Sequence, residues 1–549
     1  MTTPAGASRV APIAFALTFL LLLANGRAIG SGDTNAMERT AAALVERGTV
    51  VLAEDGTPDP FTRPAQGGRV SIYPVLPALV AAPFFFLWSL FFDLNPAGLQ
   101  AAGKITAAFL SAWATGLLAR SFARRVSLGT ALGSALIFGL GTSVYSTSQA
   151  LWQHPVAVLF LVMALDALDT VVSAAPAARR AAVVAGVCLT LAAASRPAAI
   201  PMCAALFAFL LIHARADAMR IVAAAAVPAI GVASYNAAFF GAPWRFGPLG
   251  ASGRFLGAFP ESLAGLLISP ARGLLVFTPI AIVCFLALAS RVRVSSMARG
   301  VMGAACAHLL FISLWNEWHG GESFGPRLLT DLLPALFFYL PEGLSAWPKA
   351  GAVLGVLSIA IQLLGGFTYD YRWERLHQRG REFDSALWSW RDSPIAFALH
   401  EGVVIQGAPD LDGRRLRLRV SRSRPFGPQG SIIEAGLQGL RTSGPPLVRD
   451  IRLERGARLS DRGAALSHPA DALAFRVLVP GMRSVRLIGA LDGTLRIETS
   501  AGGSTSIPTS GDFDVTVQVQ AAAGEEVFVR AETGDLRLTR VEAKGDLSP

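Results

Sequence analysis

Long apolar runs separated by short polar loops fill the first 400 residues of the chain. Most runs are about 15 to 22 residues long, close to the length that an α-helix needs to cross a bilayer. The pattern predicts a polytopic α-helical membrane bundle over residues 1–400. The runs are 10–25, 73–92, 99–119, 127–146, 155–173, 181–195, 198–212, 221–240, 273–289, 300–315, 328–341 and 350–366.

Basic residues gather in short loops that are separated by two apolar runs each. The positive-inside rule places such loops in the cytoplasm. Parity then gives about eleven crossings, and the proline-bearing run 73–92 becomes a juxtamembrane or re-entrant helix rather than a crossing. The loop 26–98 and the C-terminal region are expected outside the cytoplasm. The basic loops lie at Arg120–Arg125, Arg179–Arg180, Arg215–Arg220 and Arg291–Arg299.

Residues 401–549 have a different pattern, in which short stretches alternate apolar and polar residues between Gly, Pro and Asp. Alternation with a period of two is typical of half-buried β-strands. We therefore expect a separate extracytoplasmic domain over 401–549, a β-sandwich of jelly-roll type. The alternating stretches are Leu416–Val420, Ala474–Val479, Ser484–Ile488, Thr494–Ile497, Phe513–Val519 and Val527–Ala531.

Composition agrees with a membrane protein, because 52% of the residues are hydrophobic and 16% are charged, against about 25% charged in soluble domains. The net charge of +10 comes mostly from loop arginines, which argues against nucleic acid as a partner, and no P-loop motif is found. The 4 cysteines lie in apolar segments without metal-ligand spacing and are interpreted as small buried residues. The run 10–25 is interpreted as an uncleaved first helix, with a signal peptide as the alternative.

The first outer loop carries the leading catalytic candidate, Asp33. It precedes an amphipathic stretch that predicts a short surface helix ending at Gly48. Two interpretations stay open for Asp33: a helix N-cap that accepts backbone N–H groups, and a general base beside the membrane. Glu38, on the polar face of the same helix, is expected to be solvated and is the weaker candidate.

Arg196, Arg272 and Arg327 each sit at the expected outer end of an apolar run. One such arginine alone is as well explained by a side chain that snorkels to water. Three of them favour an anionic head group as ligand, because a guanidinium binds phosphate through two parallel hydrogen bonds.

Other outer residues suit sugar recognition. The loop Trp315–Ser323 combines Glu317, His319 and Glu322 with two indoles, which can stack on sugar rings and bond hydroxyls; an interfacial aromatic girdle is the alternative. His154, at the start of a run, is of interest only if Asp33 is near. Tyr73 is expected in the interfacial belt, at the entry to the run 73–92.

Several short motifs follow one another at these outer loops, and in this order they resemble the GT-C glycosyltransferases, the group that includes protein O-mannosyltransferases and the lipid A aminoarabinose transferase. The resemblance covers residues 10–370. It rests on Gly32-Asp33 with Leu44–Gly48, Gly68–Pro77, Trp152–His154, Ser195–Pro197, Ser269–Leu274 and Ser323–Arg327.

The resemblance implies an outer-loop aspartate as catalytic base, and Asp33 is the matching residue. It implies a polyprenyl-phosphate sugar donor, transfer on the outer face of a bacterial cell membrane, and inversion at the sugar carbon. Arg196, Arg272 or Arg327 would stabilise the departing lipid phosphate. Many members have a second acid beside the first. Here Thr34 follows Asp33, so Glu38 or another loop would have to supply it, and the use of a divalent metal stays open.

Two other function classes were weighed against the transferase. A transporter or flippase of a lipid-linked glycan usually has repeated halves and ionisable groups near the bilayer centre. This chain shows no internal repeat, and its intramembrane acids Asp166, Asp169 and Asp331 are scattered. A non-catalytic scaffold that presents the β-rich domain is the third class. Polar residues concentrated on one face favour the transferase, with the sugar and the acceptor (glycan, lipid or protein) undetermined.

Overall fold

The computed structural model of the chain divides into two compact units, Met1–Ser421 and Arg422–Pro549. It describes residues 4–53, 59–175, 177–246, 255, 258–369, 371, 373–374, 377, 381–401, 404–409, 415–419, 430–436, 439–443, 448–454, 458–460, 463–466, 472–477, 482–500, 504–521, 525–533 and 536–545. The boundary between the units falls some way after the end of the predicted bundle at residue 400.

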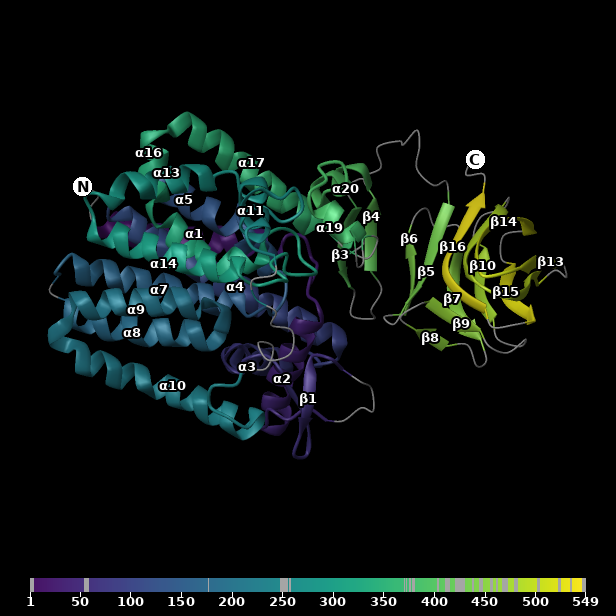
Figure 1. Cartoon of the computed structure of the whole chain (residues 1–549), viewed down its shortest axis with the longest axis horizontal. Coiled ribbons are helices and arrows are strands. Elements are labelled where there is room, and N and C mark those ends of the chain that lie inside the picture. The colour runs from purple at the N-terminus through teal and green to yellow at the C-terminus, as the bar shows by residue number, and fades with distance from the viewer. Residues whose placement is uncertain are drawn as a thin grey trace. The chain divides into compact units, whose positions relative to one another are not determined.

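The first unit is a bundle of apolar helices (Figure 1). Six helical segments among the described residues are long and apolar enough to cross a membrane, and five shorter ones are apolar. The predicted helical membrane bundle is thus confirmed, whereas the number of crossings stays a prediction. The helices are α1 Pro4–Leu23, α2 Gly32–Arg47, α3 Leu76–Ser89, α4 Pro96–Ala123, α5 Leu128–Leu140, α6 Ser143–Thr147, α7 His154–Val172, α8 Ala178–Ser195, α9 Ile200–His213, α10 Ala218–Phe240, α11 Glu261–Ile268, α12 Leu274–Phe277, α13 Ala281–Val292, α14 Ser296–Ser313, α15 Leu333–Leu336, α16 Leu340–Ala346, α17 Pro348–Thr368, α19 Arg381–Leu387 and α20 Pro394–Glu401.

Shorter elements complete the unit. They are the 3-10 turns η1 Pro197–Ala199, η2 Arg215–Asp217, η4 Arg327–Leu332 and η5 Phe337–Tyr339, and two hairpins, β1 Thr62–Ala65 with β2 Gly68–Ser71 and β3 Val404–Pro409 with β4 Arg415–Arg419.

Two apolar runs are broken by proline. The run 273–289 forms α12 and then α13, because Pro279 lacks an N–H group and disfavours the helical conformation of the residue before it. The run 328–341 alternates 3-10 and α-helical turns, with Pro334 and Pro341 each opening a new helix. A short 3-10 piece of this kind changes the direction of the chain.

Helix α7 separates the basic loops from the predicted site residues. His154 begins the helix, whereas Asp166 and Asp169 near its other end pair with Arg124. The 19 residues of α7 span about 28 Å at 1.5 Å per residue. The basic loop and His154 therefore lie at opposite ends of the bundle, and the positive-inside rule predicts that the His154 end faces out.

Cysteine labelling would test this orientation. In a chain with Cys306 replaced by serine, Glu317→Cys is expected to react with a membrane-impermeant maleimide in intact cells, because Glu317 is exposed in the loop at the His154 end. Arg180→Cys, in a basic loop, should react only after the membrane is permeabilised. The reverse pattern would show that the site faces the cytoplasm.

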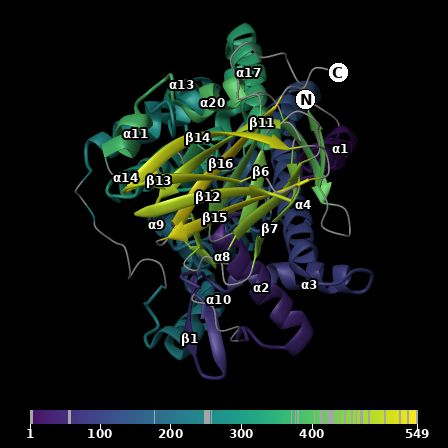
Figure 2. The same cartoon turned by 90° about the vertical axis from the view of Figure 1, so that its right-hand side faces the viewer.

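The second unit consists of antiparallel sheets whose strands face the viewer in Figure 2. One sheet has the order β13-β12-β15-β10-β7, and the other runs β14-β11-β16-β5-β6, with β9 paired to β16 and β8 paired to β9. The strands are β5 Gly430–Gly436, β6 Gly439–Ser443, β7 Val448–Glu454, β8 Arg458–Ser460, β9 Gly463–Leu466, β10 Ala472–Val477, β11 Met482–Ala490, β12 Gly493–Thr499, β13 Ser504–Thr509, β14 Asp512–Ala521, β15 Glu526–Thr533 and β16 Leu536–Gly545.

Apolar residues from both sheets, such as Leu487 on β11 and Leu495 on β12, form one buried core in this unit. The strand-rich character predicted for the C-terminal region is confirmed. Residues 420 and 478–479 of the predicted stretches lie outside the described residues. The jelly-roll type and the extracytoplasmic position stay predictions.

Candidate active site

Asp33 lies in the first turn of α2. The N-cap of this helix is Ser31, so the interpretation of Asp33 as the cap is wrong. Thr34 closes the turn by accepting the Ser31 N–H at 3.1 Å and donating to the Ser31 carbonyl at 2.9 Å. The Ser31 hydroxyl donates to Asp33 Oδ1 at 2.8 Å. The carboxylate also gains from the positive end of the helix dipole.

Arg327 contacts Asp33 directly. Its Nη1 lies 3.2 Å from Asp33 Oδ2, which joins segments 294 residues apart in the chain. Its Nη2 donates to the Gly320 carbonyl, and its guanidinium lies 4.3 Å from the centre of the Trp152 ring. The side chains of Arg327 and Asp33 are 13% and 20% exposed, so the pair is partly shielded but open to a ligand.

Two aromatic residues, Phe61 and Tyr73, pack at the start of α2. Phe61, just before β1, packs so closely on Gly32 that a Cβ there would meet its ring, and it stacks on Tyr73. Tyr73 donates a hydrogen bond to Asp33; burial, and then the negative charge of Asp33, raise the pKa of Tyr73. The phenol therefore stays protonated, and it serves as a donor to the carboxylate.

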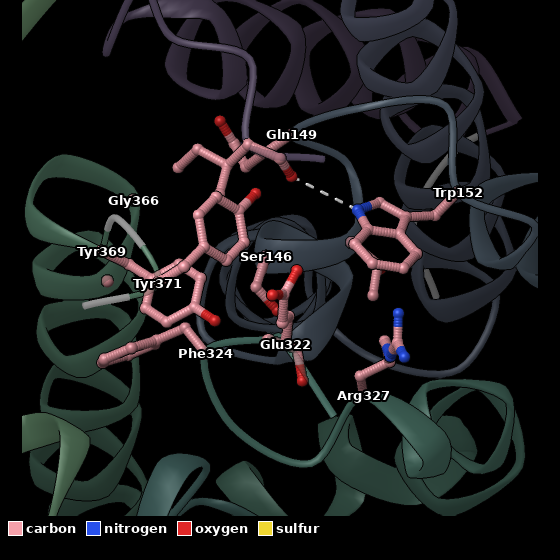
Figure 3. Close-up of a pocket in the computed structure, with 13 residues that line it drawn as sticks. Ser146, Gln149, Trp152, Glu322, Phe324, Arg327, Gly366, Tyr369 and Tyr371 are labelled. Atoms are coloured by element: carbon pink, nitrogen blue, oxygen red, sulfur yellow. Dashed lines mark hydrogen bonds between the residues drawn. The ribbon is translucent and has the colours of Figure 1, made fainter. Parts of the chain in front are cut away.

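A pocket of about 360 Å³ adjoins this pair (Figure 3). Glu322 lies between Tyr371 and Arg327 in this view, and the Trp152 indole donates to the Ile29 carbonyl at 3.4 Å. The pocket thus offers aromatic faces together with hydroxyl, amide, carboxylate and guanidinium groups. Its lining is Ile29, Ser146, Thr147, Gln149, Trp152, Glu322, Ser323, Phe324, Arg327, Gly365, Gly366, Tyr369 and Tyr371.

A buried lysine, Lys104, hydrogen-bonds to Gln149, which lines the pocket. Lys104 of α4 donates to Asn25, to the Arg27 carbonyl at 2.5 Å and to Gln149 Oε1 at 2.7 Å. Arg27 in turn donates to the Tyr369 carbonyl at 2.6 Å. The sequence hypothesis missed this cluster, although a lysine inside an apolar run is a recognised sign of a functional or structural polar site in membranes.

Arg272 is in the interior and does not snorkel to water. Its side chain is fully buried and pairs with Glu374 at 2.8 Å. It also donates to the carbonyls of His319 and Gly321 at 3.0 Å each. These bonds fix the loop that carries Gly320, whose carbonyl accepts from Arg327. Arg272 therefore helps to hold Arg327 in position and does not itself line the pocket.

Arg196 is likewise turned inward. It caps α8, is 6% exposed, and pairs with the fully buried Asp331. Its other contact is the ring of His154. His154 therefore lies beside Arg196, and its ring centre is 6.2 Å from that of Trp152. That His154 lies near Asp33 stays a prediction.

The three polar residues predicted in the loop 315–323 have different surroundings. Glu322 lines the pocket, and Glu317 is exposed away from it. His319 accepts the Gly321 N–H at 3.3 Å. Burial and the charge of Arg272 lower the pKa of His319 to about 4, so its ring is neutral at pH 7.

Glu38 was expected to be solvated, and this prediction is wrong. Its side chain is 3% exposed and packs on Gly103 of α4, where a Cβ would lie 2.5 Å from the carboxylate. Burial raises the pKa of Glu38 to about 8. Among the described residues no group of three or more His, Cys, Asp or Glu is placed to hold a metal ion.

The Glu38 carboxyl makes stability depend on pH. Its pKa rises from an ordinary value of 4.5 to about 8 on folding, so the protonated form favours the folded state. That contribution is complete below pH 4.5 and is lost as the pH rises through 8. The thermal unfolding midpoint of the wild type should therefore decrease as the pH is raised from 5 to 9. In Glu38→Gln this decrease should be smaller. Parallel curves would show that Glu38 is charged or solvated.

Solved membrane glycosyltransferases are similar to this chain. ArnT from Cupriavidus metallidurans bound to undecaprenyl phosphate has 14% identity and a TM-score of 0.43, over 72% of this chain and 68% of that one. The arabinofuranosyltransferase AftD from Mycobacteria has 11% identity and a TM-score of 0.40, over 98% and 59%. The apo oligosaccharyltransferase of Archaeoglobus fulgidus has 10% identity and a TM-score of 0.42, over 98% of this chain and 96% of that one.

All three are GT-C superfamily membrane glycosyltransferases. No protein-family model and no curated protein matches the chain. At these identities and TM-scores the likeness carries no inference about donor, acceptor or catalytic residues, which have to come from the geometry of this chain itself.

Proposed function

We propose that this chain is a membrane glycosyltransferase that moves a sugar from a polyprenyl-phosphate donor to an acceptor at the outer face of the membrane. The observation that carries the proposal is the contact between Asp33 and Arg327 at 3.2 Å, at the edge of an aromatic-lined pocket. A carboxylate and a guanidinium are the two groups that the transfer needs: one to accept a proton, one to balance a phosphate charge.

Asp33 is proposed as the general base. An acceptor hydroxyl oxygen attacks the sugar C1 while its proton passes to Asp33, and the bond from C1 to the phosphate oxygen breaks. The electron pair leaves with the polyprenyl phosphate. Ser31, Arg327 and Tyr73 donate to the Asp33 carboxylate, and its remaining lone pair can receive the acceptor hydroxyl.

Arg327 is proposed to bind the phosphate of the donor. Its guanidinium belongs both to the Asp33 contact and to the pocket lining. The negative charge on the phosphate oxygen grows as the C1–O bond breaks, so a cation fixed at that point lowers the barrier. Arg196 and Arg272 are proposed to position this site rather than to touch the phosphate, since Asp331 and Glu374 already pair with them.

The pocket is proposed to hold the sugar. Trp152, Tyr369 and Tyr371 present ring faces, while Gln149 and Glu322 present groups that hydrogen-bond hydroxyls. Whether the acceptor is a glycan, a lipid or a protein is left open.

Mass analysis of envelope glycans, glycolipids and glycoproteins from cells with and without the gene would test the proposal. One envelope component should lose the mass of a sugar in the cells that lack the gene, and expression of the wild-type chain should restore it. Identical glycans in both strains would contradict a transferase role.

A further inference from the structure

Arg327 has two partners in the proposed reaction, the Asp33 carboxylate and the phosphate of the donor, and it is needed by each at a different stage. In the structure its Nη1 is held by Asp33. The same side chain lines the pocket next to Glu322 and Trp152 (Figure 3). While this hydrogen bond is made, a lone pair of Asp33 Oδ2 is occupied by the guanidinium and is closed to an acceptor hydroxyl.

The contacts of Arg327 permit a second position. Its guanidinium lies 4.3 Å from the centroid of the Trp152 ring, a contact that does not depend on the bond to Asp33. Its Nε–H is buried, and within the described part of the chain it has no hydrogen-bond acceptor. A buried donor without a partner gains from an arriving anion. Arg327 is therefore only partly satisfied by its protein partners.

The second hydrogen bond of Arg327 goes to a backbone carbonyl and not to a second charge. The Gly320 carbonyl accepts from Arg327 Nη2, in a loop whose Gly320 and Gly321 have φ values of 73° and 67°, a conformation that favours glycine. Arg272 holds the carbonyls of His319 and Gly321, so the loop stays in place. A shift of Arg327 toward an anion is therefore a rotation of its own side chain.

We propose that the Arg327–Asp33 pair is a latch that donor binding opens. The phosphate of the donor draws the guanidinium off Asp33, and Asp33 becomes a competent base only then. This inference rests on the proposed function and adds an order of events to it: the lipid-phosphate donor binds first, and the acceptor hydroxyl is activated second. Without a donor, the paired carboxylate does not deprotonate a hydroxyl or water in the site.

A double-mutant cycle on binding tests the latch without any sugar transfer. The affinity for undecaprenyl phosphate is measured in detergent for the wild type, Asp33→Asn, Arg327→Gln and the double variant. Undecaprenol, which has no phosphate, is the uncharged control ligand. Asp33→Asn should tighten binding about two- to fivefold, because the phosphate no longer competes with a partly exposed ion pair. Arg327→Gln should weaken it by about tenfold or more.

The decisive comparison is the effect of Asp33→Asn in the two backgrounds. The latch predicts that the gain disappears when Arg327 is already Gln. An equal gain in both backgrounds would mean that Asp33 merely repels the phosphate, and would overturn the latch. Weaker binding by Asp33→Asn would mean that the two side chains hold the phosphate together, and would overturn it too.

Further controls separate this result from other failures. Arg39→Gln breaks a second arginine–aspartate pair, to Asp59, that has the same 3.2 Å length and starts from the same helix α2; it should leave the affinity unchanged. Arg327→Met, which also removes the charge, carries the cycle if Arg327→Gln does not purify as a folded protein. No binding of undecaprenyl phosphate by any form would reject the donor class and the latch together, whereas binding without coupling rejects the latch alone.

Discussion

Replacement of Asp33 by asparagine is expected to lower the rate of sugar transfer by about 10²- to 10⁴-fold, the usual contribution of a general base. Asparagine keeps the size of the side chain, and its single amide oxygen can still accept from either Ser31 or Arg327, but it cannot take the acceptor proton. The rate is measured as incorporation of the sugar into the envelope acceptor in cells that carry either form, at matched protein levels in the membrane.

Asp59→Asn is the matched control for this prediction. Asp59 is a partly exposed acid of the same outer region, paired with Arg39 at 3.2 Å, and it does not line the pocket. Its replacement should leave transfer within about twofold of the wild type, as expected for a surface ion pair. Unchanged transfer by Asp33→Asn would remove the base from the proposed mechanism.

Replacement of Arg272 by methionine is expected to destabilise the protein by about 3 to 5 kcal/mol, because it leaves the carboxylate of Glu374 buried without its cation. Three backbone carbonyls, of His319, Gly321 and Ala271, lose their donor at the same time. The measurement is the thermal unfolding midpoint of the detergent-purified protein, with the yield of folded protein as a second readout.

The double variant Arg272→Met/Glu374→Gln separates charge from packing. Removal of both charges should recover a large part of the lost stability, since the buried unpaired charge is the costly feature. Arg180→Met, at an exposed arginine of a basic loop, should leave the midpoint unchanged. If Arg272→Met also left it unchanged while undecaprenyl phosphate binding was lost, Arg272 would be a ligand contact, as the sequence hypothesis had it.

Apolar patterning predicts where the helices of the first unit lie, and local chemistry decides where they break. The run 155–173 coincides closely with α7, because its residues are apolar apart from a few polar ones near its end, and no proline interrupts it after the first turn. The run 328–341 is equally apolar, yet Pro334 and Pro341 divide it into short turns. Hydropathy measures burial and carries no information on backbone hydrogen bonds, which explains the difference.

The candidate site could be predicted only in part. Asp33 and Arg327 meet as expected, since both sit at loop motifs of the resemblance. Arg272 turns inward because its partner, Glu374, comes from a segment that no sequence pattern connects with it. Glu38 lies on the polar face of α2 in the sequence, but Gly103 lets α4 approach that face and bury it. Such pairings depend on tertiary packing, which a one-dimensional pattern does not contain.

The central claim is that Asp33 drives transfer from a polyprenyl-phosphate sugar, and the level of that donor in the membrane tests it most directly. Mass spectrometry would quantify polyprenyl-phosphate-linked sugars in cells that lack the gene, in cells complemented with the wild type and in cells complemented with Asp33→Asn. The account predicts that one lipid-linked sugar accumulates in the first and third strains and falls to its normal level in the second. A normal level in the strain with Asp33→Asn would contradict it.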